Sequence, residues 1–264
     1  MSKLVADQAD GLRRLLAPKP TRVIAVAGMG QGAGGTTAAM NLGVALVQQG
    51  KSVLLLDEHC PKEGSACEVW AIDPLGSLAD VASHRLTLDG AEVQAGCGVH
   101  VLPAPPGVAP DTTDPRALWP EGVVIVDAAF DSEGRLSPLA RAADDLLLVL
   151  KPHPASITSA YAGIKNLHYA HGLKQLRFLI NGVVDVDGAQ QIMNNLANAG
   201  SRYLALSLLP AGLVRFDARI PDAWRLKQTI AEAFPASAAA VDFRRLADDV
   251  GRWPWRAALP LQAA

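Results

Sequence analysis

The residues with the clearest chemical meaning form a glycine-rich loop, GMGQGAGGTT, at positions 28–37. An apolar run at 22–27 precedes the loop, and an amphipathic run at 38–49 follows it. A strand, a glycine-rich loop and a helix in this order hold phosphate groups, because backbone N–H groups at the start of the helix point at the anion. The residues of the predicted phosphate site are Gly30, Gln31, Gly32, Ala33, Gly34, Gly35, Thr36 and Thr37.

The loop lacks the cation that such a site normally carries. In the Walker form of this phosphate loop, or P-loop, a lysine directly precedes the threonine and contacts the β- and γ-phosphates. Gly35 holds that position here, and the sequence has no Lys or Arg from Val23 to Gly50. The pattern therefore indicates the body of a nucleotide switch without its main cation.

Three polar side chains are expected beside the loop. Asp57, Asp127 and Asn181 each end a short run of apolar residues that is typical of a buried strand. Ligands of parallel sheets bind at the carboxyl ends of the strands. These three residues and the loop should therefore form one site.

Magnesium is the metal that this site would hold. P-loop proteins bind Mg²⁺ through a threonine hydroxyl and a carboxylate, the positions that Thr36 and Asp127 take here. The alternative is that Thr36 only caps the helix and that Asp127 is a solvated strand end. For Asp57, a place near the metal and a role in a turn are equally open.

Apolar runs alternate with helix-like runs along most of the chain. Strands are predicted at 22–27, 52–57, 98–103, 122–127, 145–150 and 176–181, with a later one at about 203–214. Helices are predicted at 38–49, 156–171, 189–199, 223–234 and 237–250, and loops at 59–74 and 103–120. This alternation predicts a single α/β domain with a doubly wound, mostly parallel sheet and helices on both faces.

Composition argues against several classes of protein. The 264 residues carry 24 Lys and Arg against 26 Asp and Glu, a formal charge of −2, so no direct nucleic-acid partner is expected. Cys60, Cys67 and Cys97 lack the spacing of a zinc site or a disulfide framework, which fits a reducing compartment. No apolar run approaches the ~20 residues that span a bilayer. The expected location is the cytoplasm.

Taken in order, the P-loop, Asp57, Asp127 and Asn181 resemble the MinD/ParA group of deviant-Walker ATPases. Within that group the chain is similar to the FlhG/FleN branch, which controls flagellar number and placement. The stretches that carry this closer resemblance are DQADGLR at 7–13, ASITSAY at 155–161, EAFPAS at 232–237 and Trp253-Pro254. The resemblance covers nearly the whole chain and implies a P-loop NTPase fold.

The resemblance also implies that catalytic parts have changed. Gly30 stands in place of the family's signature lysine, and Gly35 in place of its Walker lysine. His59 replaces the aspartate that orients the attacking water, and Phe130 ends a turn that normally ends in glycine. Since a charge-assisted hydrogen bond contributes roughly 1.5–3 kcal/mol, losing two lysines weakens ATP affinity roughly 10²-fold to 10⁴-fold. Weak or lost ATP binding and little or no hydrolysis are expected.

Further ligand contacts are implied by the same resemblance. Asn181 and Asp217 would face the adenine of ATP or ADP bound with Mg²⁺, although the proline that the family places before that aspartate is missing. Lys151 is the candidate for a replacement cation, and its alternative is an ordinary solvated lysine. His59 is either a loop residue or a catalytic substitute.

The start of the chain carries a predicted partner site. Val5, Ala9, Leu12 and Leu16 share one face of a short helix. In the FlhG/FleN branch the matching motif acts on the FlhF GTPase, an SRP-like GTPase. The residues that would bind such a partner are Asp7, Gln8, Ala9, Leu12 and Arg13. The alternative is a helix that packs on its own domain. Flagellar basal-body and transcription-regulator proteins are the other partners implied.

Three parts are predicted along the chain: a partner-binding segment at 1–20, the P-loop domain at 21–251 and a short tail at 252–264. Pro254 and Pro260 prevent a long amphipathic helix in the tail, so any contact with the inner membrane or cell pole would be peripheral.

Two further expectations concern assembly and function. Dimers of the family form across ATP through the signature lysine, so Gly30 makes an ATP-dependent homodimer doubtful. The competing function is an active MinD/ParA-type ATP-dependent switch in flagellar control, chromosome or plasmid partition, or cellulose synthesis.

Overall fold

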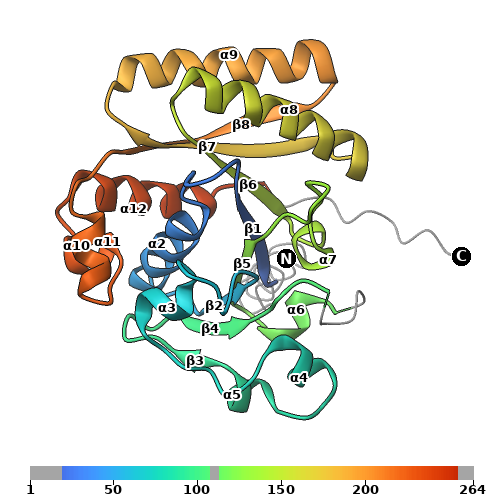
Figure 1. Ribbon diagram of the computed structural model, residues 1–264, viewed down its shortest axis with the longest axis vertical. Coiled ribbons are helices and arrows are strands. Elements are labelled where there is room, and N and C mark those ends of the chain that lie inside the picture. The colour runs from blue at the N-terminus through green and yellow to red at the C-terminus, as the bar shows by residue number, and fades with distance from the viewer. Residues whose placement is uncertain (1–19, 108–112, 255–264) are drawn as a thin grey trace, which may run out of the picture.

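An eight-stranded sheet, in the order β3-β4-β2-β5-β1-β6-β7-β8, forms the centre of the molecule (Figure 1). The computed structural model describes residues 20–107 and 113–254. The strands are β1 Arg22–Gly28, β2 Val53–Asp57, β3 Val93–Gln94, β4 His100–Pro103, β5 Val123–Ala128, β6 Asp145–Leu150, β7 Gln175–Val183 and β8 Ser207–Arg215. Neighbouring strands run parallel except β3 and β4, which are antiparallel.

The central strands are buried on both faces. Every residue of β2, β5 and β6 is buried, as continuous apolar sequences such as VLLLD and DLLLVL indicate for parallel strands between helical layers. Strand β1 lies between β5 and β6, with Val26 beside Asp127 and Gly28 beside Val149. The loop that follows β1 therefore starts next to the carboxyl ends of both neighbours.

Two layers of helices cover the sheet. The long helices are α2 Gly35–Gln48, α8 Pro154–His171, α9 Val186–Leu204 and α12 Ala238–Val250. The short ones are α3 Ala66–Trp70, α4 Leu78–Ala82, α5 Leu88–Ala91, α6 Pro115–Leu118, α7 Pro138–Arg141, α10 Ile220–Arg225 and α11 Ile230–Ala233. Helices α2, α3, α11 and α12 share one apolar core with alternate residues of the strands, and α4, α7, α8 and α9 share a second core on the other face.

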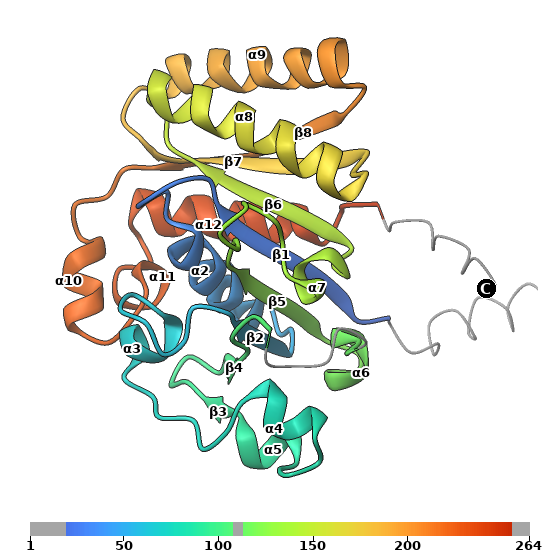
Figure 2. The same ribbon diagram turned by 45° about the vertical axis from the view of Figure 1, so that its right-hand side comes forward.

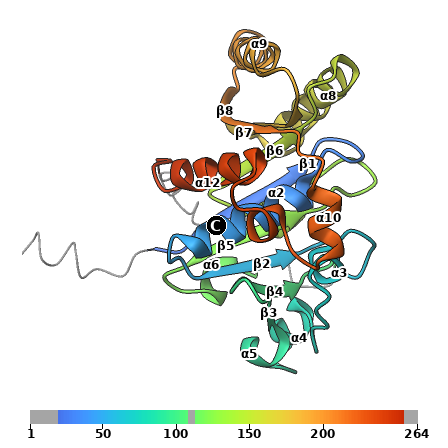
Figure 3. The ribbon, with the colours of Figure 1, turned by 90° about the vertical axis from the view of Figure 1, so that its left-hand side faces the viewer.

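The arrangement of these layers is visible in two further views. Figure 2 follows the sheet from β8, which lies beside α8 and α9, down to β3, which lies beside α4 and α5. Figure 3 shows α12 running next to α2. The predicted fold class, a doubly wound and mostly parallel sheet with helices on both faces, is confirmed.

Three predicted elements differ in kind from the structure. The predicted helix at 223–234 is wrong: two short helices, α10 and α11, occupy this region, because Lys227 takes a left-handed φ of 59° that a helix cannot contain. Glu232 then accepts the Thr229 N–H at the start of α11. The predicted loop at 59–74 contains α3, whose first turn is capped by Ser65. The predicted loop at 103–120 likewise contains α6, capped by Asp114.

Helix α9 is longer than its predicted range, 189–199. It begins at Val186, directly after Asp185, whose carboxylate accepts the Gly188 N–H, and it ends at Leu204. The strand that follows consequently starts at Ser207, later than the 203 at which the sequence placed it.

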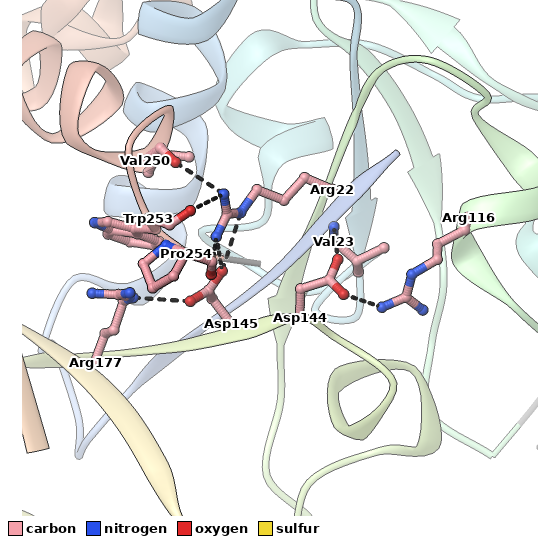
Figure 4. A network of polar contacts seen from close by, with 9 residues as sticks. All are labelled: Arg22, Val23, Arg116, Asp144, Asp145, Arg177, Val250, Trp253 and Pro254. Atoms are coloured by element: carbon pink, nitrogen blue, oxygen red, sulfur yellow. Dashed lines mark hydrogen bonds and ion pairs between the residues drawn. The ribbon is translucent and has the colours of Figure 1, made fainter. Parts of the chain in front are cut away.

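A buried ionic cluster closes the amino end of the sheet (Figure 4). Asp145, the first residue of β6, accepts hydrogen bonds from Arg22 at 2.6 and 3.1 Å and from Arg177 at 2.9 Å. Arg22 also donates to the backbone carbonyls of Val250, Trp253 and Pro254. The guanidinium of Arg177 lies 4.1 Å from the centre of the Trp253 ring. The first described part of the predicted tail thus packs on the domain.

Two predicted regions of interest lie outside the described residues: the partner motif at 7–13 and the tail beyond Pro254. Within 20–107 and 113–254, the structure contains no helix with the length and apolar character needed to cross a membrane.

Candidate phosphate-binding site

The glycine-rich loop bridges the end of β1 and the start of α2. Gly30, Gly32 and Gly34 adopt left-handed φ values of 105°, 65° and 90°, which glycine takes without strain. The Met29 N–H donates to Val149 O at 2.8 Å, which fastens the start of the loop to β6. Glycine at these three positions therefore allows the backbone to form a cradle.

The loop is too tight at Gly35 for the lysine that its position usually holds. A Cβ placed on Gly35 would lie 2.7 Å from the Gly28 backbone N and 3.1 Å from its Cα. At Gly30 a Cβ meets nothing within 4 Å, but the left-handed φ disfavours any side chain. Glycine at both positions therefore suits this backbone, and a side chain at either one would strain it.

A cavity of about 400 Å³ lies over the loop. Side chains from the segment after β2, from the end of β5 and from α10 close it. The lining residues are Gly28, Gly30, Gly32, Ala33, Gly34, Gly35, Thr36, Thr37, His59, Glu63, Gly64, Ala128, Phe130 and Trp224. The structure therefore brings His59 and Phe130 to the loop, as their places in the sequence suggested.

Asp127 is the group in the site that most clearly lacks a partner. It is fully buried, and neither of its carboxylate oxygens has a hydrogen-bond partner. His59 Nε2 lies 3.8 Å from Asp127 Oδ1. Burial raises the pKa of Asp127 well above its usual range, Asp57 raises it further, and the Thr36 hydroxyl acts in the opposite direction.

This environment fits a bound cation. A buried carboxylate without hydrogen bonds is costly unless it is protonated or coordinates a metal. Thr36 lies in the first turn of α2 beside it, and the N-cap of that helix is Gly34. The alternatives of a solvated strand end for Asp127 and a helix cap for Thr36 therefore do not hold, and the donor pair suits Mg²⁺.

Asp57 serves the turn after β2. Its carboxylate accepts three backbone N–H groups, from His59 at 2.8 Å, Cys60 at 3.1 Å and Ala66 at 2.9 Å. Both oxygens are occupied in this way. Of the two roles left open by the sequence, the geometry favours the turn.

Glu58 is a residue of this region that sequence reasoning missed. It is 1% exposed, accepts the Ala129 N–H at 2.8 Å and accepts the Ser137 hydroxyl. Burial raises the pKa of Glu58 to about 7, against the effect of these two hydrogen bonds. The carboxyl group ties the end of β2 to the segment after β5, which carries Phe130.

The two residues expected at the adenine have other contacts. The Asn181 amide donates to Ala33 O at 2.9 Å, and its Nδ2 would lie 2.2 Å from a Cβ placed on Gly34. Asn181 thus braces the loop from β7.

Asp217 pairs with Arg219 at 3.1 Å and is absent from the described lining of the cavity. Burial acts to raise the pKa of Asp217, but hydrogen bonds from Arg219 and Ser237 outweigh it and hold the pKa low.

Lys151 approaches the loop from the end of β6. A Cβ placed on Gly32 would lie 3.2 Å from Lys151 Nζ. The ammonium group therefore stands directly against the loop, although a lysine at a strand end is commonly solvated.

Two known proteins are similar to most of this chain. The antiactivator FleN of Pseudomonas aeruginosa is 30% identical over 251 residues, which cover 89% of this chain and 88% of FleN. The chromosome-partitioning ATPase Soj of Thermus thermophilus is 29% identical over 251 residues, which cover 87% of this chain and 95% of Soj. No protein-family model matches the chain.

Solved structures of MinD proteins share the fold. MinD of Aquifex aeolicus gives a TM-score of 0.71 at 18% identity and covers 92% of this chain and 100% of its own. MinD of Pyrococcus horikoshii, solved in complex with Mg-ADP, gives a TM-score of 0.65 at 20% identity. The match covers 87% of this chain and 96% of that one. At these identities the likeness concerns the fold, and the predicted P-loop NTPase fold is confirmed.

Proposed function

Because this chain belongs to the FlhG/FleN family of MinD/ParA-type P-loop proteins, we propose that it regulates flagellar number, placement and assembly together with an FlhF-type GTPase. The observation that carries this proposal is the similarity to FleN, which spans nearly all of both chains. The P-loop fold is kept in this function as a scaffold, and regulation proceeds through contacts with other proteins.

The nucleotide site supports a role for the P-loop domain as a scaffold rather than as a catalyst. The cradle and the Thr36–Asp127 pair are retained and would hold ATP or ADP with Mg²⁺, which neutralises phosphate charge when bound. Gly30 and Gly35 supply no cation to a transferring phosphoryl group. Binding is weak because each lost charge-assisted hydrogen bond removes roughly 1.5–3 kcal/mol. Hydrolysis is absent or very slow because a cation at that place is worth about 10³–10⁵ in kcat.

Partner recognition belongs to the first part of the chain in this proposal. Asp7, Gln8, Ala9, Leu12 and Arg13 contact the FlhF-type GTPase. Basal-body or transcription-regulator proteins are further partners, in keeping with the name antiactivator given to FleN. The protein works in the cytoplasm, with peripheral contact at the inner membrane or cell pole, and without direct contact to nucleic acid.

The test is a count of flagella per cell in a flagellated host that lacks the gene. Complementation with the wild-type gene should restore the number, and complementation with Gln8→Ala should not, because that variant loses the GTPase contact. Gln190→Ala, which changes an exposed glutamine of α9, is the matched control and should restore it. Normal flagellation in the deletion strain contradicts the proposal.

An active ATP-dependent switch is the second candidate, and the similarity to Soj favours it. Phosphate release from ATP and sizing with and without ATP and Mg²⁺ separate the two functions. The regulator should release no phosphate above the blank and keep one elution volume in both states. Turnover that Asp127→Asn abolishes, together with ATP-dependent dimerisation, would establish the switch.

A further inference from the structure

The cavity over the loop has a charge deficit that a polyphosphate ligand would expose. Among its described lining residues there is no Lys or Arg, and Glu63 adds a carboxylate. Backbone N–H groups at a helix start attract an anion, but a di- or triphosphate also needs full positive charge to be held in water. The charge has to come from Mg²⁺ at Asp127 and from a side chain that reaches the loop from another element.

Lys151 meets the geometric requirement for that side chain. It follows β6, the strand next to β1, and its ammonium group lies 3.2 Å from the position of a Cβ on Gly32. Within the described residues the ammonium group has no hydrogen bond or ion pair. Lys151 is not among the described lining residues of the cavity, but its ammonium group lies against the Gly32 side of the loop and keeps its three donors available for a ligand.

The glycine pattern agrees with this placement. Gly32 leaves room for the ammonium group, whereas a Cβ there would stand in tight contact with it at 3.2 Å and would sit on a backbone with a φ of 65°. Gly35 is closed to a lysine by the Gly28 backbone. The loop therefore admits a cation from β6 and excludes one from the start of α2.

We infer that Lys151 supplies from β6 the positive charge that the P-loop lacks, and that it binds the di- or triphosphate group of a nucleotide. The buried Asp127 carboxylate is the independent sign of a ligand, because neither of its oxygens has a hydrogen bond and Mg²⁺ carried by that nucleotide would give them one further partner besides His59 at 3.8 Å. This inference rests on the proposed nucleotide site and not on the flagellar role.

The experiment is calorimetric titration of the full chain with ADP and Mg²⁺. Lys151→Ala should raise the Kd for ADP about 10-fold to 100-fold, as loss of one charge-assisted hydrogen bond requires. Lys151→Arg should keep the Kd within a few-fold of wild type. Lys165→Ala, which removes an equal charge from α8 where the ammonium group lies 6.0 Å from the Tyr169 ring, should leave it unchanged. Thermal midpoints of all variants check that each is folded.

Three results would overturn the inference. They are no ADP binding by the wild type, equal Kd values for wild type and Lys151→Ala, and an equal loss of affinity in Lys165→Ala. None of them bears on flagellar number, which is counted in cells. If the deletion strain has an abnormal number of flagella while one of these three results is found, this inference fails and the proposed function stands.

Discussion

Glu58 couples two loops of the site through one buried carboxyl group. Its partners, Ala129 and Ser137, lie 71 and 79 positions away along the chain. Because the pKa of Glu58 is raised to about 7 in the fold from 4.5, the folded protein binds its proton more tightly than the unfolded chain does. Its contribution to stability is complete below pH 4.5 and is lost as pH rises through about 7.

Glu58→Gln should remove that part of the pH dependence. The amide keeps an acceptor for the Ala129 N–H and turns a donor toward the Ser137 hydroxyl, which donates to the carboxyl group in the wild type. Between pH 5 and 8 the wild type should lose about 2.5 kcal/mol more stability than the variant does, at 1.36 kcal/mol per pKa unit. Urea unfolding at several pH values in EDTA measures this, and parallel curves for the two proteins would contradict it.

Asp127 and Asp57 are both buried, yet their substitution should have opposite effects. Without Mg²⁺ at pH 8, Asp127→Asn removes a buried carboxylate that has no hydrogen bond and should raise the free energy of unfolding by roughly 1–3 kcal/mol. Asp57→Asn is the matched control. Its amide donor would face a backbone N–H that the Asp57 carboxylate accepts, and the free energy of unfolding should fall by roughly 1–3 kcal/mol.

Magnesium gives the second readout of the same pair. Wild type and Asp57→Asn should both gain stability as MgCl₂ is added, because a ligand that binds only the folded state shifts the unfolding equilibrium. Asp127→Asn should not respond. A response in Asp127→Asn equal to that of the wild type would place the ion elsewhere.

At the scale of elements, the cluster at Asp145 joins β1, β6, β7 and the segment after α12. Arg22 and Arg177 are each 6% exposed, so their guanidinium groups depend on this carboxylate. Arg22 also meets Val250 O at the carboxyl end of α12, where the helix dipole favours a cation.

Asp145→Asn should therefore lower the free energy of unfolding by about 3–5 kcal/mol, since it removes the buried negative charge that Arg22 and Arg177 share. Asp249→Asn is the control: it breaks an ion pair with Arg252 that is largely exposed and should change stability by less than about 1 kcal/mol. Urea unfolding of both variants measures the difference. Equal changes in the free energy of unfolding for the two variants would show that the buried cluster contributes no more to stability than an exposed ion pair does.

For the whole molecule, the sequence predicted what is local and missed what depends on distant contacts. The doubly wound sheet followed from apolar runs, and the loop, Asp127 and Thr36 followed from a motif. The break at Lys227 was missed because a left-handed lysine has no signature in the sequence. Glu58 was missed because both of its partners come from the segment after β5, and the brace of Asn181 on Ala33 depends on the approach of β7.

The close approach of Gly28 and Gly35 limits how this loop could be re-engineered into a catalyst. With the Gly28 backbone N only 2.7 Å from the place of a Cβ on Gly35, Gly35→Lys meets main chain rather than open space. The substitution alone should therefore displace the loop before it adds a useful cation. A design that aims at ATP turnover has to rebuild the backbone from Gly28 to Gly35 first.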